Sequence, residues 1–112
     1  MKFDIKKKNN VVIVILDGDM VGGPDATLLS EKFRELIDEG KNRILLDMKH
    51  VDYMNSSGLG ILIAGVTTIR NSGGDLKLLN LVKKLHDLLR ITKLHQIFDI
   101  YENEDKAIDS FA

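Results

Sequence analysis

Hydrophobic and polar residues follow two different patterns near the start of the chain. Residues 3–7 alternate apolar and polar side chains, whereas Val11 to Leu16 is an uninterrupted apolar run rich in β-branched residues. Asn9 and Asn10 separate the two stretches, and asparagine tolerates the backbone conformation of tight turns. The pattern predicts a β-hairpin whose second strand is the more deeply buried one.

Helical spacing begins after a glycine-rich break. Pro24 suits the first turn of a helix, because its missing N–H group removes no intrahelical hydrogen bond there. From this point five apolar residues fall on one side of a helix, and Gly40 fits the residue just beyond its end. Those five are Leu28, Leu29, Phe33, Leu36 and Ile37. The segment is therefore predicted to be an amphipathic helix.

The rest of the chain repeats this alternation of short apolar runs and helical stretches. Strands are predicted over 43–48, 76–81 and 96–101, and helices over 58–70, 82–90 and 104–111. The order ββαβαβαβα, with helices joining successive strands, is typical of a mixed sheet that carries helices. We expect an α/β fold over residues 1–112 as one domain: a four- or five-stranded mixed sheet with about four helices, packed mainly on one face.

Composition removes several classes of function. A formal net charge of −1 argues against a nucleic-acid-binding protein, and the only basic run, Lys6 to Lys8, is explained by solubility at the hairpin tip. The absence of cysteine excludes disulfides, thiol catalysis and cysteine-ligated zinc. No apolar stretch approaches the roughly 20 residues that span a bilayer, and no secretory signal is expected. No membrane association and a cytoplasmic location are therefore the expectation.

The stretch Asn55-Ser56-Ser57-Gly58-Leu59-Gly60 lies between a predicted strand and the second helix. Asparagine and serine are preferred N-cap residues, since their side-chain oxygens accept hydrogen bonds from the free N–H groups of the first turn. On one interpretation Ser56 or Ser57 is only such a cap. On the other, one of these hydroxyls is modified, because the N-terminus of a helix tolerates a phosphate.

The helix that follows has two apolar sides. Leu59, Leu62, Ile63, Val66 and Ile69 form a stripe wide enough to face a core. The opposite side carries no charge, whereas a solvated helix face usually carries lysine and glutamate. It consists of Ser57, Gly60, Ile61, Ala64, Gly65 and Thr68. We expect this uncharged face, with Ile61 exposed on it, to contact another protein or another part of the chain.

These segments together resemble a STAS domain, specifically a stand-alone bacterial anti-sigma factor antagonist. The resemblance includes the N-terminal hairpin and the segments at 44–62, 73–81 and 88–108. In that family the first serine of the motif, here Ser56, is phosphorylated by an anti-sigma factor that is an ATP-dependent serine kinase, and a PP2C-like serine phosphatase reverses the modification. The resemblance implies partner binding through Asp19, Asn55, Ser57, Gly58, Leu59, Gly60, Ile61, Ala64, Gly65 and Thr68.

Two positions depart from the family pattern. The family usually has aspartate directly before the phosphorylated serine, where this chain has Asn55. The loop after the second strand keeps Gly18 and Asp19 but carries Val21 where aspartate is usual. Both positions bear on the identity of the partner, and Asn55 also bears on the rates of phosphorylation and dephosphorylation.

Other functions have less support in the sequence. His50, His86 and His95 lack ligand-like spacing, and the aspartates near residue 20 lack the calcium-loop pattern that ends in glutamate. No phosphate-binding loop motif is present, and Ser56 has no activating base nearby in sequence. We therefore expect no catalysis, no metal and no cofactor. The alternative that stays open is a STAS scaffold without a phosphorylation cycle, such as a subunit of a lipid-transport assembly.

Overall fold

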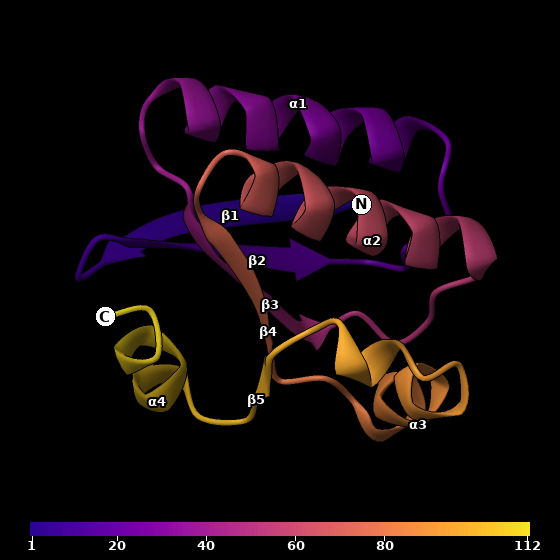
Figure 1. Cartoon of the computed structure of the whole chain (residues 1–112). Coiled ribbons are helices and arrows are strands. Elements are labelled where there is room, and N and C mark those ends of the chain that lie inside the picture. Colours follow the sequence, from indigo (N-terminus) through magenta and orange to yellow (C-terminus); the bar gives the residue numbers. More distant parts are fainter.

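The elements of the computed structural model, which describes all 112 residues, follow the predicted order along the chain (Figure 1). The strands are β1 (Lys2–Lys8), β2 (Val11–Asp17), β3 (Arg43–His50), β4 (Asp75–Leu79) and β5 (Ile100–Tyr101). The helices are α1 (Pro24–Asp38), α2 (Ser56–Asn71), α3 (Lys83–Ile91), the 3-10 turn η1 (Leu94–Gln96) and α4 (Glu104–Asp109).

The five strands form one sheet in their sequence order. Strands β1 and β2 pair antiparallel, and Asn9 and Asn10 both take positive φ angles of 53° and 65° between them. That conformation is the type I′ turn that suits a two-residue hairpin. The other neighbours pair in parallel, because α1, α2 and α3 each carry the chain back to the start of the next strand. The predicted mixed sheet is confirmed.

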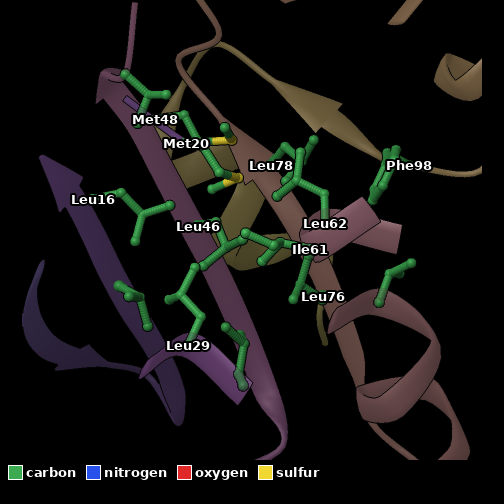
Figure 2. Packing of buried hydrophobic residues seen from close by; sticks show 14 of the residues in the cluster. Leu16, Met20, Leu29, Leu46, Met48, Ile61, Leu62, Leu76, Leu78 and Phe98 are labelled. Carbon is green, nitrogen blue, oxygen red and sulfur yellow. The ribbon is translucent and has the colours of Figure 1, made fainter. Parts of the chain in front are cut away.

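Most of the core lies on one face of the sheet. Helices α1 and α2 run side by side over this face (Figure 1), and apolar residues of α3 join the same cluster of 22 buried residues. Figure 2 shows Leu16, Leu46 and Leu78 of the sheet packing against residues of the covering helices. Helix α4 lies on the opposite face, over a smaller cluster of Val11, Ile13, Leu45, Leu79, Ala107 and Ile108.

Helix α4 is held to the sheet by charged contacts at both ends. Lys6 lies 3.2 Å from Glu104 and Lys8 lies 3.2 Å from Asp105, in the first turn of the helix. At the other end, the buried ammonium group of Lys77 donates to the carbonyl and hydroxyl oxygens of Ser110. The basic run therefore lies within β1 and contacts α4, instead of serving only as the solvated tip of the hairpin.

Several predicted boundaries were wrong by a few residues. The predicted strand over 96–101 is reduced to Ile100–Tyr101, because η1 occupies its start and Phe98 turns into the core. The predicted strand over 76–81 ends at Leu79, since Asn80 takes a left-handed φ of 60°. The last helix ends at Asp109 instead of Phe111, and α2 begins at Ser56 instead of Gly58.

Candidate functional site

Two loops meet at the carboxyl ends of β2 and β3. The loop after β2 and the loop that leads into α2 pair through a short bridge between Met20 and Met54. The Met20 N–H group donates to the Tyr53 carbonyl at 2.9 Å, and the Asn55 N–H group donates to the Met20 carbonyl at 3.3 Å. Because parallel strands bring their carboxyl ends to one edge of the sheet, the loop that contains Asp19 lies beside the serine motif.

Asn55 is the N-cap of α2. Its backbone is extended, with φ −97°, and its Oδ1 accepts a hydrogen bond from the Gly58 N–H group at 2.8 Å. Ser56 and Ser57 are already inside the helix, and neither hydroxyl makes a hydrogen bond within the chain. The interpretation of Ser56 or Ser57 as the cap was therefore wrong: the extended backbone that a cap requires belongs to Asn55. Both serine side chains are exposed.

Two glycines allow the loops to approach this closely. A Cβ at Gly58 would overlap the Met20 carbonyl group, and a Cβ at Gly22 would lie 2.7 Å from Cβ of Ser57. Gly22 also has a φ of 90°, a region that side chains rarely adopt. The first turn of α2 is thus pressed against the backbone of the neighbouring loop, and Ser56 lies at the junction.

Part of the uncharged face of α2 is buried within the domain. Ile61 is only 8% exposed and packs into the main core (Figure 2), and Gly65 is buried with its Cα facing the Phe33 ring of α1. The prediction of an exposed Ile61 was wrong, because α1 lies alongside α2 and covers residues that the sheet alone leaves open. Gly58 is buried as well, so these three residues expose little surface to a partner.

The six predicted face residues nevertheless line one feature, a groove between α1 and α2. The hollow has a volume of about 470 Å³, with Ile61 and Gly65 at its buried side and exposed small residues above them. Helix α1 contributes Glu31 and Arg34 to the other wall. From α2 the lining residues are Ser57, Gly60, Ile61, Ala64, Gly65 and Thr68. Ser57 lines its end, directly beside Ser56.

The sequence analysis missed a second apolar area near the motif. Tyr53 and Met54 line a hollow of about 360 Å³ together with residues of α3, among them Ile91, which is 80% exposed. In the sequence, Ile91 is an apolar residue outside the helical stripe that ends at Leu89. This position was the signal that could have predicted the second apolar area. At the rim, a hydrogen bond from Lys83 at 2.9 Å holds the pKa of Asp87 below its ordinary value.

The structure shows no group of three or more histidine, aspartate or glutamate side chains placed to hold a metal ion. The helices are also too short or too polar for any of them to cross a lipid bilayer. The features that converge near residue 56 are instead an exposed hydroxyl, a helix N-terminus and a groove whose α2 wall carries no charge. This arrangement can present a serine side chain and a binding surface to another protein.

The role of Asn55 as the cap gives a stability prediction. Asn55→Ala removes the acceptor for the Gly58 N–H group and should lower the free energy of unfolding by about 1 kcal/mol. Ser56→Ala removes no hydrogen bond and should change it by less than about 0.5 kcal/mol. Urea unfolding of both variants checks the difference, with Asn55→Ser as a control that keeps a capping oxygen. Equal losses for the two alanine variants would contradict this assignment of the cap.

Comparison with known proteins agrees with this architecture. The family model for the STAS domain matches residues 2–107. The chain is 35% identical, over 105 residues and 94% of each chain, to the anti-sigma-B factor antagonist of Bacillus subtilis. A crystal structure of a Thermotoga maritima protein described as an anti-sigma factor antagonist superposes with a TM-score of 0.87 at 27% identity, covering 97% of this chain and 93% of that one.

The fold also matches a phosphorylated protein. The Bacillus cell fate determinant SpoIIAA in its phosphorylated form superposes with a TM-score of 0.74, covering 99% of this chain and all of the other. At 19% identity this likeness concerns the fold alone. The five-stranded mixed sheet with four helices is therefore the STAS arrangement.

Proposed function

The chain belongs to the STAS domain family, and from this premise we propose that it is an anti-sigma factor antagonist controlled by phosphorylation of Ser56. Unmodified, it binds an anti-sigma factor that is a serine kinase; phosphorylated, it releases that partner, and a PP2C-like phosphatase restores the free hydroxyl. The observation that carries the proposal is the position of Ser56: exposed, without a partner in the chain, in the first turn of α2 beside a groove whose α2 wall carries no charge. The names of its relatives support the antagonist role.

This chain supplies only the hydroxyl group that gains and loses the phosphate. The Ser56 oxygen attacks the γ-phosphorus of ATP, the bond to the ADP oxygen breaks, and the hydroxyl proton passes to a base of the kinase. The phosphatase transfers the phosphoryl group to water. The chain is in both steps a substrate with a binding surface, and we propose no catalytic role, no cofactor and a cytoplasmic location for it.

Physical chemistry explains how one phosphate controls docking. It adds about −1.5 to −2 charges at pH 7, next to a face that carries none. Burying that charge against an apolar partner surface costs free energy, because the phosphate loses water without gaining a paired cation. The fold itself should tolerate the group, since Ser56 is exposed and the first turn of a helix favours negative charge.

Two substitutions of Ser56 should have opposite consequences. Ser56→Ala should bind the partner persistently in the presence of Mg-ATP, whereas Ser56→Asp should weaken binding by about tenfold or more, because it places a carboxylate at the interface. The measurement is calorimetric titration against the cognate serine kinase of the anti-sigma type from the same organism. Ser56→Asn is the matched control, because asparagine has nearly the shape of aspartate and carries no charge. Equal affinities for Ser56→Asp and the unsubstituted chain would contradict the proposal.

A further inference from the structure

Asn55 makes a second hydrogen bond that its role as a cap does not require. While Oδ1 accepts from the Gly58 N–H group, the Nδ2 amide group donates to the Val21 carbonyl at 3.3 Å. The two atoms cannot exchange places, because Oδ1 would then face a carbonyl oxygen and Nδ2 would face an N–H group. One side chain therefore joins the start of α2 to the loop after β2.

The bond links the two positions at which the chain departs from the family pattern described above. Aspartate at position 55 would keep the cap, since a carboxylate oxygen also accepts from the Gly58 N–H group. It has no donor at neutral pH, so its second oxygen would face the Val21 carbonyl and repel it. The link to Val21 therefore requires an amide at position 55.

The Val21 side chain is exposed on the loop after β2. It is 45% exposed, and the two glycines that follow it have positive φ angles and turn the chain toward α1. Gly22 contacts Ser57, and the Val21 carbonyl accepts a hydrogen bond from Asn55. This part of the loop therefore contacts the residues immediately before and after Ser56. A protein that docks on Ser56 would meet the Val21 side chain next to it.

We propose that Asn55 is a positioning residue whose amide fixes Val21 beside Ser56. The pair Asn55–Val21 then determines which partner protein binds at this site. The inference rests on the proposed function for the identity of that partner. It predicts a partner surface that is apolar and uncharged opposite Val21, because the pair presents a methyl-bearing side chain and a neutral amide there. The pair acts before any phosphate is added.

The variant Asn55→Ser separates positioning from capping. Serine keeps an oxygen for the Gly58 N–H group and remains neutral, but it has no group that reaches the Val21 carbonyl. Backbone NMR order parameters of Val21 and Gly22 should fall from about 0.85 toward 0.6, and those of α2 should not change. Unchanged order parameters at Val21, or an equal fall throughout α2, would overturn the inference without involving any partner.

A double-mutant cycle tests the link to the partner. Asn55→Ser and Val21→Ala should each weaken binding of the cognate anti-sigma kinase by about fivefold, the equivalent of one net hydrogen bond or buried side-chain contact. Because Asn55 acts through Val21, the double variant should lose no more than about the same fivefold. Additive losses would overturn the pairing. If the unsubstituted chain does not bind the kinase at all, the proposed function fails, while the order parameters still decide whether Asn55 positions Val21.

Discussion

Replacing Gly58 with alanine should lower the free energy of unfolding by about 3 kcal/mol, the cost of overpacking a closed contact. The added Cβ would overlap the Met20 carbonyl group, which belongs to backbone and cannot swing away as a side-chain tip can. To accept the methyl group, the loop after β2 must move away from α2. The Met20–Met54 bridge and the hydrogen bond between Asn55 and Met20 would then be lost.

Gly60 provides the matched control. It lies two residues further along α2, is exposed, and has no atom within 4 Å of an added Cβ. Gly60→Ala should therefore stabilise the protein by up to about 1 kcal/mol, since alanine is the better helix former. Urea unfolding of the two variants measures both effects. Similar stabilities for Gly58→Ala and Gly60→Ala would show that the two loops do not pack as described.

Replacing Ile61 with lysine should destabilise the fold strongly. Ile61 is buried between α1, α2 and the sheet, so the variant loses apolar contacts and brings an ammonium group into the core (Figure 2). The expected loss is about 3 kcal/mol, which corresponds to a fall in Tm of roughly 10 °C or more for a domain of this size. Thermal unfolding followed by circular dichroism is the measurement.

Ala64→Lys is the companion variant on the exposed side of the same groove. It should leave the free energy of unfolding within about 0.5 kcal/mol and should weaken partner binding, because the lysine would add a charge to the α2 wall of the groove, which carries none. A stable Ile61→Lys protein would show that α1 does not cover this part of α2. An Ala64→Lys protein that binds the kinase with unchanged affinity would remove the groove from the docking surface.

The sheet and its helices were predictable because each is encoded by local periodicity. The hairpin followed from Asn9 and Asn10, and α1 from its single apolar stripe after Pro24. The short β5 was predicted too long, because a run of apolar residues does not reveal whether Phe98 extends a strand or turns into the core. Boundaries set by a single backbone angle, such as that of Asn80, are equally hidden.

The candidate site was predictable in its residue types and less so in its contacts. Ser56 and the uncharged face of α2 could be recognised from the sequence, but which side of a two-sided apolar helix is covered depends on where α1 lies. For this reason Ile61 was assigned to the surface. The hydrogen bond between Asn55 and Val21 spans 34 residues of sequence and has no local signature.

The most direct test of the account is to locate the phosphate. The purified chain is incubated with its cognate anti-sigma serine kinase and Mg-ATP, and intact-mass and tandem mass spectrometry follow, with Ser56→Ala and Ser57→Ala in parallel. The account predicts one added phosphoryl group on Ser56, present in Ser57→Ala and absent in Ser56→Ala. A chain that binds this kinase yet gains no phosphate, or gains it only on Ser57, would contradict the switch and favour a STAS scaffold without a phosphorylation cycle.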